Sequence, residues 1–174
     1  MKTLIVIDMQ NDFIDGALGT PEAQAIVSKV KKKIEEYRER GDIIIFTKDS
    51  HRKDYLETME GRKLPIEHCI YDTHGWEIHS DLYSHLCYEN SNVILKRSFG
   101  YRNWHRCDEE LEGPIELVGL CSDICVVSNA LILKANFPET EITVDASCCA
   151  GTTPENHKAA LQVMKCCQIN VVGE

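Results

Sequence analysis

The feature of this sequence that most constrains its fold is the alternation of short, continuous apolar runs with segments whose apolar residues recur every three or four positions. Continuous runs are typical of strands that are buried on both faces, whereas the three-and-four spacing is typical of helices with one buried face. The sequence predicts strands at 3–8, 42–47, 92–96, 115–120, 141–145 and 169–172. Repeated strand–helix units of this kind indicate an α/β fold with a parallel sheet covered on both sides.

Three segments between these strands are predicted to be helices, at 22–40, about 123–136 and about 154–167. In the last helix, Thr153 suits the N-cap and Pro154 suits the first helical position. In the first helix, one face is apolar and Gly41 would end the helix. That face consists of Ala23, Ile26, Val27, Val30, Ile34 and Tyr37.

The length and charge of the chain limit its class. A chain of 174 residues favours one domain over residues 1–174 with a sizeable core. No apolar run reaches the roughly 18–20 residues of a membrane span, and the N-terminal run "LIVI" is too short for a signal peptide. The net charge of −9 argues against a nucleic-acid surface. We therefore expect a cytoplasmic protein with neither nucleic-acid nor membrane partners, and a homo-oligomer stays open.

The chain has nine cysteines, an odd number, and no export signal, which together indicate reduced thiols rather than a disulfide framework. The pairs at 148–149 and 166–167 lack the spacing of a zinc site built from C-x-x-C motifs. We expect most of these cysteines to be small core residues.

Residues 48–91 interrupt the alternation of strands and helices. This insertion is rich in His, Asp and Glu and has little periodicity. Because long loops inside compact domains usually serve a function, we expect the insertion to take part in binding.

Reactive side chains stand at the ends of four predicted strands. Asp8 ends the first strand, Asp49 and His51 follow the second in "TKDSH", Lys96 ends the third, and the fourth leads into "GLCSDICV". Ligands of open parallel sheets bind beyond the carboxyl ends of the strands. Each residue has an ordinary explanation by itself, as a turn, surface or core residue. Together at one edge of a sheet they predict a functional site.

Cys125 is the predicted nucleophile of that site. Ser122 or Asp123 would cap the following helix, which places Cys125 in the first helical turn. There the helix dipole and the unpaired N–H groups favour an anion, so we expect a lowered thiol pKa. The same N–H groups would bind the oxyanion of a tetrahedral intermediate. Cys121 ends the strand and gains less from the dipole, so Cys125 is preferred.

Asp8 is the better candidate for the group that accepts the thiol proton, because no histidine is near Cys125 in the sequence. Lys96 beside both residues would favour the ionised carboxylate and the thiolate.

The insertion contributes a second set of residues. Asp49 and His51 form a D-x-H pair, and His68 follows in "LPIEHC". Two imidazoles and a carboxylate are a competent ligand set for Zn²⁺, Fe²⁺ or Mn²⁺, although D-x-H pairs also occur in ordinary polar loops.

The stretches "LIVIDMQNDF", "FTKDSH", "LPIEHC", "VILKRSFG" and "GLCSDICV" span residues 4–126, and "VDASCCAG" continues the pattern. In these stretches the sequence resembles the isochorismatase-like cysteine hydrolases, and among them the nicotinamidases. The resemblance implies a three-layer, Rossmann-like α/β/α sandwich around a parallel sheet of about six strands. It also implies cleavage of a small amide, with nicotinamide to nicotinate preferred over another amide or ureido compound. A non-catalytic metal or thiol protein is the alternative of a different class.

The resemblance also implies individual roles. Asp8, Lys96 and Cys125 would form a catalytic triad. A cis peptide would precede Cys121, whose backbone N–H would form the oxyanion hole with that of Cys125. Phe13 would stack against the nicotinamide ring.

For the metal, the resemblance implies one divalent ion, zinc before iron or manganese. Asp49, His51 and His68 would hold this ion, which would orient the ring nitrogen of the substrate directly or through water. Some relatives have a further ligand, for which Glu57 and Glu60 are both candidates.

The sequence departs from the family in one place. Many nicotinamidases have a tryptophan three residues before the last metal histidine, where this chain has Pro65. The second stacking partner is then missing or comes from Tyr101, Trp104 or another residue.

Overall fold

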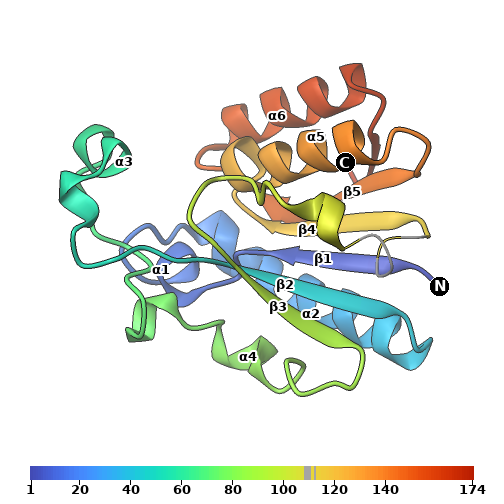
Figure 1. Cartoon of the computed structure of the whole chain (residues 1–174), viewed down its shortest axis with the longest axis horizontal. Coiled ribbons are helices and arrows are strands. Elements are labelled where there is room, and N and C mark those ends of the chain that lie inside the picture. The colour runs from blue at the N-terminus through green and yellow to red at the C-terminus, as the bar shows by residue number, and fades with distance from the viewer. Residues whose placement is uncertain (108–110, 112) are drawn as a thin grey trace.

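A single parallel sheet forms the centre of the computed structural model, which describes residues 1–107, 111 and 113–174 (Figure 1). The sheet has six strands in the order β3-β2-β1-β4-β5-β6, and all neighbours are parallel. This confirms the predicted fold class. The strands are β1 (Thr3–Ile7), β2 (Ile43–Asp49), β3 (Ser91–Lys96), β4 (Ile115–Leu120), β5 (Ile142–Ala150) and β6 (Asn170–Val172).

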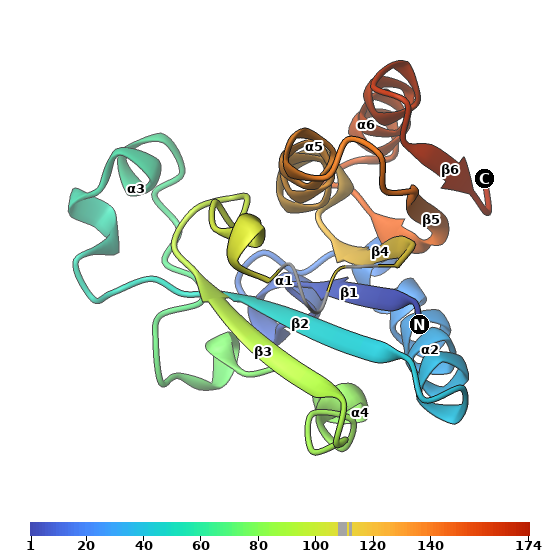
Figure 2. The same ribbon diagram turned by 45° about the vertical axis from the view of Figure 1, so that its right-hand side comes forward.

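Helices cover both faces of the sheet (Figures 1 and 2). One face carries α2 (Pro21–Glu39) with the short helices α1 (Asn11–Ile14) and α4 (Ser80–Tyr83), and the other face carries α5 (Val127–Asn136) and α6 (Pro154–Cys166). The described helices also include α3 (Met59–Lys63), a π-helical turn (Ser122–Val126) and 3-10 turns at Tyr55–Glu57, His74–Trp76 and Trp104–Arg106. None of the described helices is long and apolar enough to cross a membrane.

The two faces of the sheet each bury an apolar cluster, as the sequence pattern predicts. On β1, Leu4 and Val6 pack toward α2, whereas Ile5 and Ile7 pack toward α5. All six predicted face residues of α2 are buried. Because the central strands β1, β2 and β4 are buried on both sides, their sequences are continuous apolar runs without period-two alternation.

Strand β5 is five residues longer at its carboxyl end than the sequence predicted. The added residues are small, and Cys148 and Cys149 are buried on opposite faces. Nearby, β4 and β5 shift register between Leu117 and Gly119. Gly119 has a φ of 118°, and a Cβ there would lie 2.1 Å from the Ile7 carbonyl oxygen. Glycine therefore lets β4 approach β1 at this point.

The prediction that most cysteines are core residues holds for only four of the nine. Cys69, Cys125, Cys148 and Cys149 are buried, whereas Cys87, Cys166 and Cys167 are exposed. Cys87 lies in the turn between α4 and β3, and Cys166 and Cys167 lie at the end of α6.

Candidate active site

The site lies where the strand order changes direction. Strands β2 and β3 extend the sheet on one side of β1, and β4, β5 and β6 extend it on the other. Asp8 directly follows β1, and Cys121 directly follows its neighbour β4. The crevice beyond such a pair of strand ends is the usual ligand site of an open α/β sheet.

Asp8, Lys96 and Cys125 meet in this crevice, and we call them the triad. The Lys96 Nζ lies 2.6 Å from Asp8 Oδ2 and 3.5 Å from Cys125 Sγ. The Thr47 hydroxyl donates to Asp8 Oδ1 at 2.6 Å. All three triad residues are at most 4% exposed. The sheet thus brings together residues from the ends of β1 and β3 and from the turn after β4.

The backbone of Asp8 is held in an uncommon conformation. Its φ is 48°, in the left-handed region that residues other than glycine seldom occupy. The Asp8 N–H donates to the carbonyl oxygen and to the hydroxyl of Thr47, both at 3.2 Å. Such conformations cost on the order of 1–3 kcal/mol and concentrate at functional sites. The backbone conformation of Asp8 therefore supports a functional role over the ordinary role of a turn residue.

Burial raises the pKa of the Cys125 thiol well above its ordinary value, and the nearby Lys96 charge only partly offsets this effect. The predicted lowering of this pKa is therefore wrong, because burial outweighs the opposing charge of Lys96. Burial also raises the pKa of Asp8 against the opposing charge of Lys96. Burial by itself would lower the Lys96 pKa, but the surrounding negative charges, that of Asp8 first, raise it. Cys125 consequently rests as a thiol and needs a base, for which Asp8 is in place.

The turn that carries Cys125 begins as a π-helical segment, a form that is often found at functional sites. Cys125 lies in this first turn, as predicted, and the Leu120–Cys121 peptide bond is cis, as the family resemblance implies. The N-cap residue is Cys121, and no side chain caps the turn.

The predicted capping role of Ser122 and Asp123 is therefore wrong. The Ser122 hydroxyl lies 2.8 Å from His157 Nδ1, and Asp123 Oδ1 accepts from the Thr152 N–H at 2.9 Å. Both side chains tie the turn to the beginning of α6 instead. This contact joins segments about 30 residues apart, which local sequence cannot show.

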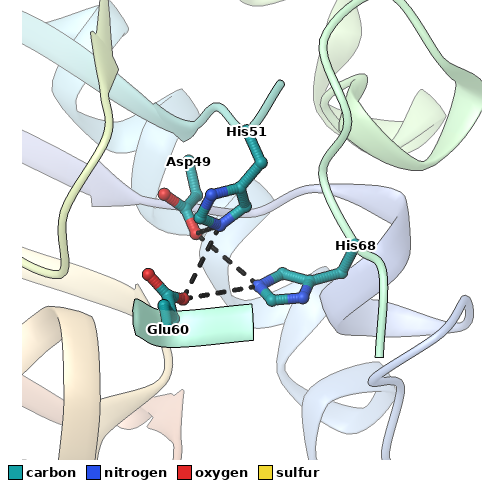
Figure 3. Close-up of side chains that lie close together, drawn as sticks. All are labelled: Asp49, His51, Glu60 and His68. Atoms are coloured by element: carbon teal, nitrogen blue, oxygen red, sulfur yellow. Dashed lines mark hydrogen bonds and ion pairs between the residues drawn. The ribbon is translucent and has the colours of Figure 1, made fainter. Parts of the chain in front are cut away.

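A second group, which we call the metal cluster, consists of Asp49, His51, Glu60 and His68 (Figure 3). Their ligand atoms all lie within 4.8 Å of one another. His51 Nε2 is 3.1 Å from Asp49 Oδ2 and 3.6 Å from Glu60 Oε1, and His68 Nε2 is 3.9 Å from each of these oxygens. Of the two glutamates that the sequence left open, the structure brings Glu60 of α3 into the group.

The geometry of the metal cluster fits a divalent ion. His68 Nδ1 lies 2.8 Å from the Ile66 carbonyl oxygen, so it donates there and leaves Nε2 to face the group. The Tyr55 ring packs against both imidazoles, at centroid distances of 4.6 and 4.9 Å. Two imidazole nitrogens and two carboxylate oxygens match the preferences of Zn²⁺, Fe²⁺ and Mn²⁺.

Two residues that sequence reasoning missed hold the metal cluster in place. The Gln10 side chain accepts from the Asp49 N–H at 2.7 Å and donates to the Asp49 carbonyl oxygen at 2.9 Å. Asp12 Oδ2 accepts at 2.7 Å from the N–H of Cys69, which follows His68. Both residues lie in "LIVIDMQNDF", so this motif could have pointed to them. Their hydrogen-bond partners, however, are 39 and 57 residues away in the sequence.

A cavity of about 490 Å³ opens onto both groups. Cys125 and Cys121 line it beside Asp49, Glu60 and His68. Phe13 also lines it, with its ring centroid 5.5 Å from that of His68.

Neither aromatic candidate for the second stacking partner is among the described residues that line this cavity. Trp104 is fully buried and donates to Asn129 Oδ1, and Tyr101 packs edge-on against Trp104. Phe99, which is 46% exposed, lines the cavity instead. The sequence contains Phe99 within "VILKRSFG", and the Asn129 amide, 30 residues away, donates to the Phe99 carbonyl oxygen at 3.2 Å.

Comparisons with known proteins agree with this geometry. A family model described as the isochorismatase domain matches residues 2–173. A Bacillus subtilis protein named as an uncharacterized isochorismatase family protein, PncA, is 32% identical, with 92% of each chain covered. The crystal structure of nicotinamidase/pyrazinamidase PncA from Bacillus subtilis is 28% identical over 98% of each chain, with a TM-score of 0.86. The structure of the Pyrococcus horikoshii pyrazinamidase in complex with zinc is 26% identical over 99% of each chain, with a TM-score of 0.84.

Proposed function

Because the chain belongs to the isochorismatase family and is a hydrolase of amide C–N bonds, we propose that it is a cysteine amidohydrolase whose substrate is nicotinamide. The products would be nicotinate and ammonia. The observation that carries the proposal is the contact of Cys125, which lines the cavity, with Lys96, which in turn pairs with Asp8. A thiol beside a lysine–carboxylate pair is suited to attack on a carbonyl carbon.

In the proposed reaction, Asp8 first takes the proton of the Cys125 thiol. The sulfur attacks the amide carbon, and the carbonyl π electrons move to oxygen. The backbone N–H groups of Cys121 and Cys125 hold this oxyanion. When the tetrahedral intermediate collapses, the C–N bond breaks and protonated Asp8 gives its proton to the departing ammonia. Lys96 stays protonated and balances the charge of Asp8 throughout.

A thioester between Cys125 and the acyl group remains. Asp8, again ionised, takes a proton from water, and the resulting hydroxide attacks the thioester carbon. The C–S bond breaks, and the sulfur leaves as a thiolate that regains the proton from Asp8. Acid–base catalysis of this kind typically contributes about 10²–10⁴-fold to a rate.

The metal cluster favours a substrate that has an atom able to bind a metal ion, such as a ring nitrogen. We propose that Asp49, His51, Glu60 and His68 hold one divalent ion, zinc in preference to iron or manganese. When bound, the ion supplies a Lewis acid that can engage the ring nitrogen of the substrate directly or through water. The observations behind this proposal are the 4.8 Å spread of the four ligand atoms and the zinc of the Pyrococcus pyrazinamidase structure.

The cavity supports a planar, largely apolar substrate. Phe13, Phe99 and Ile124 line it together with Cys125, and aromatic rings stack favourably in such sites. A second candidate substrate follows from Lys63 and Arg97, two exposed cations that line the same cavity. Their charges favour a small amide or ureido compound that carries a carboxylate.

Two features of the whole chain complete the proposal. One sheet with a core cluster on each face supports a single domain over residues 1–174, and the insertion at 48–91, which begins at the end of β2, contains all four metal ligands. The exposed thiols of Cys87, Cys166 and Cys167 suit a reducing compartment and support a cytoplasmic location.

Ammonia release from three compounds tests the substrate assignment. We expect nicotinamide to be cleaved fastest, benzamide, which lacks the ring nitrogen, to be cleaved more slowly, and an aliphatic ureido acid to be cleaved slowest. The Cys125→Ala variant serves as the blank. Equal rates with nicotinamide and benzamide would contradict the role of the ring nitrogen. A preference for the ureido acid would favour the second candidate substrate.

A further inference from the structure

A second cavity, which we call the outer cavity, lies at the carboxyl ends of β2 and β3. Its volume is about 230 Å³, and it is lined by Ser50, His51, Arg52, Tyr71, Leu95 and Arg97. The first three of these residues follow β2, and Leu95 and Arg97 flank the last residue of β3. The carboxyl ends of parallel strands are the usual place for a ligand, so the position of this cavity suits binding.

The charges around the outer cavity favour an anion. Arg52 and Arg97 are both exposed, and neither guanidinium has an ion-pair partner among the residues that the structure describes. No aspartate or glutamate is among the described residues that line the cavity, although the whole chain has a net charge of −9. Guanidinium groups form their strongest contacts with carboxylates and phosphates, and two of them match the charge of a dianion.

His51 connects the outer cavity to the metal cluster. It lines the outer cavity, whereas the other three members of the cluster line the active-site cavity. Its Nε2 contacts Asp49 and Glu60 (Figure 3). Histidines that bind a metal normally donate their second ring N–H to an acceptor, as His68 does to the Ile66 carbonyl oxygen. Within the described part of the chain, His51 Nδ1 has no such partner, and an oxyanion in the outer cavity would supply one.

The remaining walls indicate what kind of anion fits. The Ser50 hydroxyl is already engaged, because it donates to the Lys48 carbonyl oxygen at 3.1 Å and accepts from Trp76 Nε1 at 2.7 Å. Tyr71 and Leu95 are 56% and 46% exposed, and the Tyr71 ring is held against that of Trp76 at a centroid distance of 4.6 Å. The cavity therefore combines two cations with apolar surface. A phosphomonoester with a small apolar or aromatic group combines the matching features.

We propose that the outer cavity binds a phosphomonoester, whose phosphate lies between Arg52 and Arg97 and accepts from the ring N–H of His51. The bound ester would support His51 from behind and so tighten the binding of the metal ion. The effect on the metal rests on the proposed metal cluster, whereas the binding of the ester does not. Inorganic phosphate has the same charge but lacks the apolar group, so the two sources of phosphate can be distinguished.

Isothermal titration calorimetry on the full chain without metal tests the binding itself. Phenyl phosphate should bind with a Kd of about 1 mM or tighter, since two charge-assisted contacts supply roughly that free energy. Inorganic phosphate should bind more weakly, and acetate, with one charge, most weakly. Absence of saturable binding would overturn the proposal, and phosphate that binds as tightly as phenyl phosphate would overturn the choice of an ester.

Substitution of Arg52 locates the ligand, because Arg52 lines the outer cavity and is not among the described residues that line the active-site cavity. Arg52→Gln should weaken the binding of phenyl phosphate by about tenfold or more. Arg102→Gln is the matched control, because Arg102 is also exposed but is not among the residues that line the outer cavity. It should leave binding unchanged. Equal losses in both variants would reveal attraction to surface charge in general and would overturn the site.

The affinity for zinc, measured by competition with a chelator, tests the link to His51. Hydrogen-bond partners of metal-bound histidines typically contribute about 10–100-fold to metal affinity, so saturating phenyl phosphate should tighten zinc binding by about tenfold. Arg52→Gln should bind zinc like the parent without the ester and should not respond to it. An unchanged affinity in a parent that binds the ester would overturn the contact with His51. Failure of the calorimetric test would overturn the site whether or not zinc binds.

Discussion

The two halves of the candidate site are built in different ways. The triad stands at the carboxyl ends of strands and in the turn after β4, is almost fully buried, and has contacts of 2.6 and 3.5 Å. The metal cluster takes Asp49 from the last position of β2 and His51 from just after it, but Glu60 and His68 from farther along the insertion. The ligand atoms of its four ion pairs are 3.1 to 3.9 Å apart. The Glu60 side chain is 23% exposed.

This difference shows which part of the geometry the sheet fixes. The triad is in contact before any substrate binds, because parallel strands place its residues at one edge. The metal cluster depends on how the insertion folds back over that edge, and an ion would complete it. The Lys96 Nζ lies 3.4 Å from Asp49 Oδ1, so the halves touch at one point. We therefore expect that substitutions can damage the triad and the metal cluster separately.

The largest expected effect is loss of the nucleophile. Cys125→Ala should lower ammonia release from nicotinamide by at least about 10⁴-fold, since no other group of the triad can form the thioester. Cys121→Ala should retain much of the activity, because only its backbone N–H is used. Assays of both variants under identical conditions check this. Retained activity in Cys125→Ala with a loss in Cys121→Ala would exchange the two roles.

Asp8→Asn should have the next largest effect. The change keeps the size of the side chain, and asparagine tolerates the left-handed backbone, but the proton acceptor is lost. A decrease of about 10²–10⁴-fold in kcat is expected with the fold intact. Asp42→Asn is the matched control, because Asp42 is also a buried carboxylate in an ion pair, with Arg40, but lies at the other end of the sheet. Activity of Asp8→Asn within a few-fold of the parent would contradict its role.

Removal of the metal should separate the two halves. Chelation, or His51→Ala, should raise KM and reduce turnover of nicotinamide, because binding and orientation of the substrate suffer. The rate at which a small alkylating agent modifies Cys125 should stay within a few-fold of the parent, because the triad keeps its contacts. Elemental analysis and alkylation kinetics on the same samples check this. Full amidase activity without metal would contradict the assigned role of the cluster.

The smallest expected effect distinguishes the two glutamates. Even residues that only support metal ligands typically contribute about 10–100-fold to metal affinity, so Glu60→Gln should weaken binding of zinc by at least tenfold. Glu57→Gln, in the adjacent 3-10 turn, should leave zinc binding unchanged. Competition with a coloured chelator measures both affinities. Equal affinities for the two variants would remove Glu60 from the cluster.

The strand ends show how much the sequence could predict. Asp8 and Lys96 follow apolar runs directly, and Asp49 follows one after two residues. Parallel strands bring such residues to one edge without further information. The four ligand atoms of the metal cluster could not be assigned in the same way. Glu57 and Glu60 are three residues apart in a segment without strong periodicity, and only the fold of the 3-10 turn and α3 separates them.

Long-range polar contacts explain the remaining errors. Ser122 looked like an N-cap, yet its hydroxyl pairs with His157, 35 residues away. The Cys125 pKa was expected to fall at a helix start, but complete burial of the thiol raises it. Burial of a polar group depends on the whole tertiary structure, so no local pattern could have given its sign.

The most direct test of the account is the mass of the enzyme during turnover. When nicotinamide hydrolysis is quenched rapidly, intact-protein and peptide mass spectrometry should find one nicotinoyl group on Cys125 of the parent and none in Cys125→Ala. The adduct should persist longer at lower water content or at lower temperature, because both slow the hydrolysis of a thioester. Steady release of ammonia with no acyl group on Cys125, or an acyl group on Cys121, would contradict a mechanism centred on the triad.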